Sequence, residues 1–218
     1  ESDLHIYSPA GLKEIIEIQL NTAHVKLPFN LHFHTLDSEG TLYEDQTINI
    51  FAFKVNHRIP CFGFIFRELR NPRKLIIEEV RKYNVPVEFY DQLHQGEDFI
   101  SPRGEVIPNE MLTTERPPGK SYAYCADTAY DESICHHIRG ADLVYHESTY
   151  LKDKEIRAAE RFHSTSVQAA TIAKKAGIKK LLIGHYSSMY EDILIFQEEA
   201  RQVFPNTEAT IEGVCYRA

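Results

Sequence analysis

The stretch "LVYHESTY", residues 143–150, places a polar pair, His146 and Glu147, at the end of an apolar run. A short apolar run of this kind is typical of a buried strand. Three interpretations of Glu147 are open: a metal ligand, a carboxylate that orients a catalytic histidine, or a strand end that turns polar as it reaches water. The choice among them decides whether the chain is an enzyme.

Outward from this stretch, the chain alternates between strand-like and helix-like patterns. Strands are expected over 3–8, 29–36, 47–55, 61–67, 121–126, 142–146, 179–184 and 207–212. Helices are expected over 9–23, 73–83, 131–138, 151–161, 164–176 and 191–203. This alternation, with no internal repeats, predicts an α/β or α+β layered domain.

Length and composition are those of an ordinary globular protein. The chain has 218 residues, 43% of them hydrophobic and 26% charged, which suits a single domain, 1–218. No apolar run approaches the roughly 20 residues of a membrane helix, and no secretory signal is visible. The four cysteines form no C-x-x-C pair, so we expect reduced thiols in a cytoplasmic protein.

Residues 68–120 differ from the rest in being rich in proline and poor in strand-like alternation. We interpret this segment as a protruding arm. Although the net charge of the chain is −8, residues 67–82 hold six Arg and Lys against three Glu. This basic stretch is either a solvated helix face or an element that contacts phosphates.

Metal-competent side chains follow three of the expected strands: His57, Asp127 and His185. Sites collect at strand ends in α/β folds, so we expect these side chains to share one site, with Glu147 as a fourth strand end. Imidazole and carboxylate are the usual ligands of catalytic zinc, which activates water for attack on an ester or phosphodiester. His163 instead precedes a helix, where Ser164 or Thr165 is the N-cap, and a histidine in this position suits general acid chemistry.

The stretch "LHFHTLD" offers a substitute ligand set, His32, His34 and Asp37. Two histidines at i and i+2 of a strand share a face and could chelate a metal. The spacing lacks a final histidine, however, and two histidines on a solvent face are the favoured interpretation.

Five motifs in order carry a resemblance to a known family: "NHRIPCFGF", "YAYCADT", "YHESTY", "FHSTS" and "IGHYSSMY". Together they resemble the second half of ribonuclease Z, the tRNA 3′-processing endonucleases of the metallo-β-lactamase superfamily. The resemblance implies an αββα sandwich and two zinc ions, with manganese as an alternative. It implies that His57 ligates one zinc, His185 the other, and that Asp127 bridges both.

The same resemblance implies roles for the remaining candidates. His163 would protonate the leaving 3′ oxygen, and Glu147 would support His163 rather than bind metal. Segment 68–120 would be the flexible arm that grips precursor tRNA and serves the partner subunit of a homodimer. Lys120 and Ser164 are candidates for substrate contact, with an ordinary surface lysine as the alternative for Lys120.

The chain also departs from the family pattern. The H-x-H-x-D-H motif, which supplies further zinc ligands and the general base, is absent, and we expect it upstream of Glu1. The domain and its metal site are therefore expected to be incomplete in this chain, and cleavage to be impaired. Met189 stands where the family usually has Arg, and Ala126 where it usually has Gly.

The leading interpretation is a zinc-dependent endoribonuclease that removes 3′ trailers from precursor tRNA. One alternative keeps the superfamily but assigns a small substrate, as in a phosphodiesterase or an arylsulfatase-like hydrolase. Another is a metal-poor tRNA-binding half without activity of its own.

Overall fold

The computed structural model describes residues 3–69, 72–116 and 118–218. Arg70, Asn71 and Pro117, which belong to the predicted arm, lie outside the described residues. The chain divides into two compact units. The first comprises the described residues of Glu1–Asp45, Asn49–Arg67 and Lys120–Ala218, and the second comprises those of Gln46–Ile48 and Glu68–Gly119.

The first unit is built on a mixed seven-stranded sheet with the order β13-β12-β11-β10-β5-β4-β3. Its strands are β3 (Gly40–Glu44), β4 (Ile48–Lys54), β5 (Phe62–Glu68), β10 (Ser121–Cys125), β11 (Leu143–Glu147), β12 (Lys180–Gly184) and β13 (Thr207–Ala209). Strands β10 to β13 run parallel, and β5 runs antiparallel to β10. The parallel half brings the carboxyl ends of β10, β11 and β12 to one edge.

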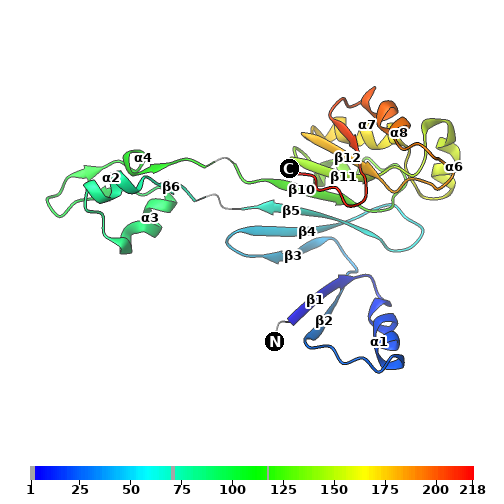
Figure 1. Ribbon diagram of the computed structural model, residues 1–218, viewed down its shortest axis with the longest axis horizontal. Coiled ribbons are helices and arrows are strands. Elements are labelled where there is room, and N and C mark those ends of the chain that lie inside the picture. The colour runs from blue at the N-terminus through cyan, green and yellow to red at the C-terminus, as the bar shows by residue number, and fades with distance from the viewer. Residues whose placement is uncertain (1–2, 70–71, 117) are drawn as a thin grey trace. The chain divides into compact units, whose positions relative to one another are not determined.

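Helices of the first unit cover one face of this sheet, as Figure 1 shows for α7 and α8. These helices are α5 (Ile134–His137), α6 (Glu155–Glu160), α7 (Ser166–Ala176) and α8 (Leu194–Arg201), with a 3₁₀ turn η2 (Lys152–Lys154) before α6. The register places Ile65, Ala123 and Val144 side by side on the covered face. These side chains are buried with Phe196 of α8, and their removal from water is the main source of stability here.

Helix α7 begins immediately after the candidate site, and its ends are well defined. Thr165 is the N-cap, and it forms a capping box in which its hydroxyl accepts from the Gln168 N–H while the Gln168 side chain accepts from the Thr165 N–H. Gly177 ends the helix in the left-handed conformation at φ 63°. The N-terminus of α7 therefore fixes the backbone that follows His163.

A second, two-stranded sheet pairs β1 (Asp3–Ser8) in parallel with β2 (Asn30–Thr35), joined by α1 (Leu12–Thr22). Both strands and the helix were expected from the sequence. The strand β3, which the sequence analysis did not predict, pairs antiparallel with β4. Its residues, "GTLYE", follow a turn and lack a clear apolar alternation.

The second unit has its own small core. Six buried side chains form it: Val80, Val85, Leu93, Phe99, Ile107 and Leu112. Its elements are β6 (Lys74–Leu75), α2 (Ile77–Lys82), the 3₁₀ turn η1 (Val87–Phe89), α3 (Tyr90–Gln95), β7 (Phe99–Ile100), β8 (Val106–Ile107), α4 (Asn109–Leu112) and β9 (Thr113–Thr114). The buried Asn109 amide donates to the carbonyls of Leu93 and Glu97, each at 2.9 Å, and so ties α4 to the end of α3.

The helix expected over 73–83 is shorter, as α2, and four two-residue strands occur where little strand structure was expected. Strands this short leave no alternation for the sequence to display. In the part of the chain that the structure describes, no helix has both the length and the apolar character needed to cross a bilayer.

Candidate active site

The predicted strand-end residues converge at one edge of the seven-stranded sheet. Asp127 lies two residues beyond β10, Glu147 is the last residue of β11, and His185 directly follows β12. Four of the candidate residues line one cavity of about 640 Å³: His57, which follows β4, Asp127, His163 and His185. The strand-end residues that were expected to share one site thus lie around one cavity, except Glu147, which is not part of its lining.

Glu147 is almost completely buried, with 1% of its surface exposed, yet both carboxylate oxygens are well supplied with donors. One oxygen accepts from the backbone N–H groups of Thr128 (3.1 Å) and Ser164 (3.0 Å) and from Nδ1 of His163 (2.8 Å). The other accepts from the backbone N–H (3.0 Å) and the hydroxyl (2.9 Å) of Thr149. The two oxygens thus accept five hydrogen bonds, so Glu147 faces inward to its neighbours and is not a strand end turned to water.

His163 is held in one tautomer by this carboxylate. An ionised carboxylate only accepts, so Nδ1 of His163 carries the hydrogen and Nε2 is left for other partners. The hydrogen bond to Glu147 raises the pKa of His163, against the opposing effects of burial and of the Arg58 charge. A histidine whose protonated form is stabilised in this way is suited to hold and deliver a proton.

His185 is oriented through Thr149. The Thr149 hydroxyl lies 2.8 Å from Nδ1 of His185, and its own hydrogen is directed to Glu147. The hydroxyl therefore accepts from the His185 Nδ1–H, which leaves Nε2 of His185, 3.6 Å from an Asp127 oxygen, as a possible ligand atom. The backbone of His185 is left-handed, with φ 63°.

His57 is oriented by a backbone carbonyl. Its Nδ1 lies 3.0 Å from the carbonyl oxygen of Phe162, so this nitrogen donates and Nε2 is the ring nitrogen left for other partners. Phe162 itself has φ 60°, a left-handed conformation, at the turn that ends α6. The loop that carries His57 is also tied to the segment after β10, since the Asn56 N–H donates to the Thr128 hydroxyl at 3.1 Å.

The donor set fits a divalent metal ion. Asp127, His163 and His185 each offer one ligand atom, and these three atoms lie within 4.8 Å of one another. The orienting contacts of the histidines are those that metal-ligating histidines commonly make with carboxylates, carbonyls and hydroxyls. This set contains His163, expected as the proton donor, and does not contain His57, expected as a ligand. The ring centres of His57 and His163 are 5.4 Å apart, so His57 borders the set.

The two predicted substrate contacts are placed differently. Lys120 precedes β10, at the end of that strand opposite to Asp127, and its ammonium lies 3.8 Å from an Asp142 oxygen. Ser164 is completely buried, and its hydroxyl donates to the Thr128 carbonyl at 2.8 Å. Neither residue lines the cavity. Their contact with substrate stays a prediction.

Two hydroxyl residues of the site were not predicted. Thr149 joins Glu147 to His185, and Thr128 joins the loops that follow β4 and β10. Their position in the sequence could have indicated them, because Thr149 lies two residues after Glu147 and Thr128 directly follows Asp127. His146 is buried, and its hydrogen bonding is incomplete. Its Nδ1 lies 2.6 Å from the Glu147 carbonyl, but its buried Nε2 has no partner among the described residues.

The alternative histidine pair lies on β2. His32 and His34 are exposed, and Nε2 of His34 lies 2.8 Å from Nδ1 of His5 on the adjacent β1. This arrangement agrees with the expectation of histidines on a solvent-exposed face. Met189, which stands at the position of a usual arginine, is 51% exposed and does not line the cavity.

Comparison with known proteins places this site in a family. Residues 82–186 match a model of the beta-lactamase superfamily domain. The chain is 41% identical over 216 residues to the ribonuclease Z of Bacteroides thetaiotaomicron, covering 98% of this chain and 68% of that protein. It is 39% identical over 211 residues to the ribonuclease Z of Porphyromonas gingivalis, covering 96% and 69%.

Solved structures show the same fold. The short form of human tRNase Z superposes with a TM-score of 0.60 at 22% identity, covering 87% of this chain and 62% of that one. The metallo-β-lactamase fold protein YhfI of Bacillus subtilis gives a TM-score of 0.59 at 18% identity, covering 96% and 62%.

Together, the mixed sheet and the strand-end site define a metallo-β-lactamase-type hydrolase fold. Within that class, the identity and coverage of the bacterial relatives show that the chain belongs to the ribonuclease Z family.

Proposed function

We propose that this chain carries catalytic residues of a metal-dependent endoribonuclease that removes the 3′ trailer from precursor tRNA. The observation that carries the proposal is the buried Glu147 carboxylate, which orients His163 directly and His185 through Thr149 at the edge of one cavity. The proposal agrees with the relatives, which are named ribonuclease Z.

In this proposal the metal ions are two zinc ions, with manganese as an alternative. His57, Asp127 and His185 would hold them, with Asp127 as the ligand common to both. When bound, such ions lower the pKa of water and stabilise negative charge on a phosphoryl group. The support is the donor chemistry: His57, Asp127 and His185 line one cavity, each histidine directs Nδ1 to an acceptor, and Nε2 of His185 lies 3.6 Å from an Asp127 oxygen.

His163 donates the proton to the leaving 3′ oxygen. Its Nδ1–H is committed to Glu147, so the proton is delivered from Nε2. Glu147 stabilises the charged imidazolium before transfer and keeps the ring in one orientation after transfer. General acid catalysis of this kind contributes typically 10²–10⁴-fold to a rate.

The second unit, within the segment 68–120, is proposed to bind precursor tRNA. Its separate core supports an independent role, and the basic stretch 67–82 supports contact with a polyanion. A homodimer, in which this unit serves the partner subunit, and a cytoplasmic location complete the proposal.

Two alanine variants test the site. His163→Ala is expected to lose turnover on precursor tRNA while it keeps its metal content, because the proposed ligands His57, Asp127 and His185 remain. Asp127→Ala is expected to lose both metal ions. Metal analysis alongside a cleavage assay gives both values. Equal metal loss in the two variants would show that His163 is a ligand and not the proton donor.

The same measurements on the unaltered 218-residue chain test the activity itself. Weak metal binding and slow cleavage at the mature 3′ end are expected, and cleavage is expected to stop when metal is removed. A chain that binds metal but leaves precursor tRNA intact while hydrolysing small phosphodiesters would contradict the proposed substrate.

A further inference from the structure

Three arginines line the same cavity as the candidate metal ligands. Arg58 directly follows His57, Arg157 lies on α6, and Arg161 is the C-cap residue of that helix. They approach from two separate segments of the chain, the loop after β4 and the end of α6. The two segments meet where Nδ1 of His57 donates to the Phe162 carbonyl, so the three arginines belong to one region of the lining.

These guanidinium groups are not neutralised by the protein. In residues 3–69, 72–116 and 118–218, no carboxylate lies within 4.0 Å of Arg58, Arg157 or Arg161. The acidic residues of the lining are Asp127, which faces His185, and Glu160. In a chain with 32 acidic and 24 basic residues, three unpaired arginines in one cavity mark a place prepared for an external anion.

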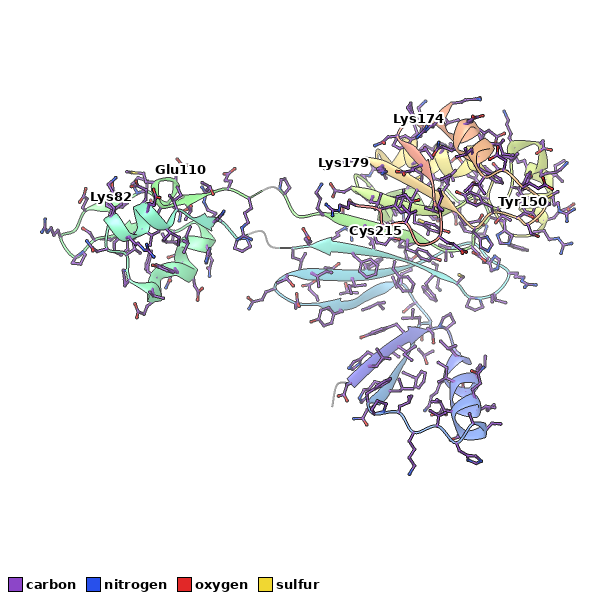
Figure 2. All side chains as sticks on the ribbon, in the orientation of Figure 1. Lys82, Glu110, Tyr150, Lys174, Lys179 and Cys215 are labelled. Carbon is purple, nitrogen blue, oxygen red and sulfur yellow. The ribbon has the colours of Figure 1, made fainter. Side chains whose placement is uncertain are left out.

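The positions on α6 strengthen this argument. Arg157 and Arg161 are four residues apart and thus one above the other, and the Arg161 N–H donates to the Arg157 carbonyl at 3.1 Å. Like charges at this spacing destabilise a helix. The Arg157 guanidinium also lies over the ring of Tyr150, 6.0 Å from its centre, which limits its mobility (Figure 2 labels Tyr150). Two such charges side by side, neither with a carboxylate partner among the described residues, suit the binding of phosphates.

We infer that Arg58, Arg157 and Arg161 form a binding site for the phosphodiester backbone of an RNA strand, which they position across the cavity for His163. The inference rests on the proposed endoribonuclease function. Arginine suits this task because its planar group donates two parallel hydrogen bonds to a phosphate. Contacts of this kind set the position of a strand and carry no sequence information.

Binding without cleavage tests the inference. The full chain is treated with EDTA, and the affinity for fluorescently labelled precursor tRNA is measured by anisotropy at several salt concentrations. Arg58→Gln, Arg157→Gln, Arg161→Gln and the triple variant are compared with Arg139→Gln, an exposed arginine after α5 that does not line the cavity. Thermal unfolding checks that each variant is folded.

Each cavity substitution is expected to weaken binding and to lower the slope of log K against log salt by about one. The triple variant is expected to lose about two to three units of slope. Arg139→Gln is expected to match the unaltered chain, and Arg161→Lys to retain most of the slope but not the full affinity. A folded triple variant with the slope and affinity of Arg139→Gln would overturn the inference.

The outcomes separate this inference from the proposed function. If the chain cleaves precursor tRNA and the triple variant keeps its affinity, slope and KM, the arginine site is wrong and the function stands. If the chain binds RNA through these arginines but cleaves no precursor tRNA, the arginine site stands and the proposed function is wrong.

Discussion

The hydroxyl oxygen of Thr149 lies 2.8 Å from Nδ1 of His185 and 2.9 Å from the Glu147 carboxylate. Because the hydroxyl has a single hydrogen, which it donates to Glu147, it must accept from His185. One buried carboxylate therefore sets the tautomers of two histidines, His163 by direct contact and His185 through a threonine. Residues beyond the direct ligands often control metal affinity in this way.

Replacing Thr149 with valine tests this arrangement. The variant is expected to bind zinc about 10–100-fold more weakly, because His185 loses the acceptor that keeps hydrogen on Nδ1. Zinc titration measures the affinity, and ¹⁵N NMR of the metal-free chain reports the His185 tautomer. Thr149→Ser keeps the hydroxyl and is the matched control. Unchanged zinc affinity and tautomer in the valine variant would contradict the assigned role.

Replacing Glu147 with glutamine is expected to destabilise the fold by about 2–5 kcal/mol. The amide has one accepting oxygen for five donors, and its own N–H groups face the N–H groups of Thr128 or Thr149. Urea unfolding measures the loss. The pKa of His163 is expected to fall as well, because the hydrogen bond to the Glu147 carboxylate, which raises it, is lost. A stability within 0.5 kcal/mol of the unaltered chain would contradict the role of the Glu147 carboxylate as the acceptor of these five hydrogen bonds.

Asp142 gives a pH-dependent prediction far from the cavity. Burial raises the pKa of this carboxyl, but hydrogen bonds from Lys179 and Ser121 outweigh burial and lower it to about 2. A lowered folded-state pKa stabilises the protein above the unfolded-state value near 3.8. The contribution, about 2 kcal/mol, is expected to disappear as the pH falls from about 4 through about 2.

Asp142→Asn is therefore expected to lose stability at pH 7 and to approach the unaltered chain at low pH. Chemical unfolding across this pH range measures the difference. Glu198→Gln, at an exposed position on α8, is the control and is expected to change stability by less than about 0.5 kcal/mol throughout. If the difference in unfolding free energy between Asp142→Asn and the unaltered chain does not vary with pH, the lowered pKa of Asp142 does not stabilise the fold.

Two glycines in strands form a matched pair for a packing prediction. A Cβ at Gly63 would overlap the ring of Phe53 and lie 2.9 Å from the Tyr124 carbonyl oxygen, whereas a Cβ at Gly40 meets nothing within 4 Å. Gly63→Ala is expected to cost about 1–3 kcal/mol or more, and Gly40→Ala to be neutral or slightly stabilising. Urea midpoints measure both. Equal midpoints would contradict the close packing at Gly63.

The second unit can be removed at a defined point, because Arg67 of β5 lies opposite Ser121 of β10 in an antiparallel pair. Replacing residues 69–119 with an Asn-Gly turn is expected to leave the large sheet folded, since such turns join antiparallel strands. Affinity for precursor tRNA is expected to fall at least about tenfold, with a smaller salt dependence. Anisotropy measures this loss. Unchanged tRNA affinity and cleavage would show that the second unit does not bind the substrate.

Much of the large sheet was predictable from the sequence because its strands are buried and apolar. The strands around Ala123, Val144 and Leu181 were predicted within one or two residues, and the polar residues that follow them met in one cavity. The seven-stranded order was not predictable, because strand pairing depends on contacts between distant segments. The two-residue strands of the second unit were not predicted, because a segment of two residues is too short to show the alternating pattern of a strand.

The site was predictable in its residues but not in all of its contacts. His57, Asp127 and His185 follow strands, a pattern visible along the chain. The hydrogen bond from His57 to the Phe162 carbonyl joins residues 105 positions apart, and no local pattern indicates it. Ser164 was a candidate for substrate contact, and its burial and the bond from its hydroxyl to the Thr128 carbonyl were likewise not visible in the sequence.

The left-handed backbone at His185 has an evolutionary consequence. A histidine at φ 63° costs about 1 kcal/mol or more relative to a glycine, which adopts this conformation readily. Replacement of His185 by glycine would therefore give a protein that folds more securely but lacks the proposed metal ligand. If related proteins keep a histidine at this position although it lowers stability, that would indicate selection for the chemical function of its side chain.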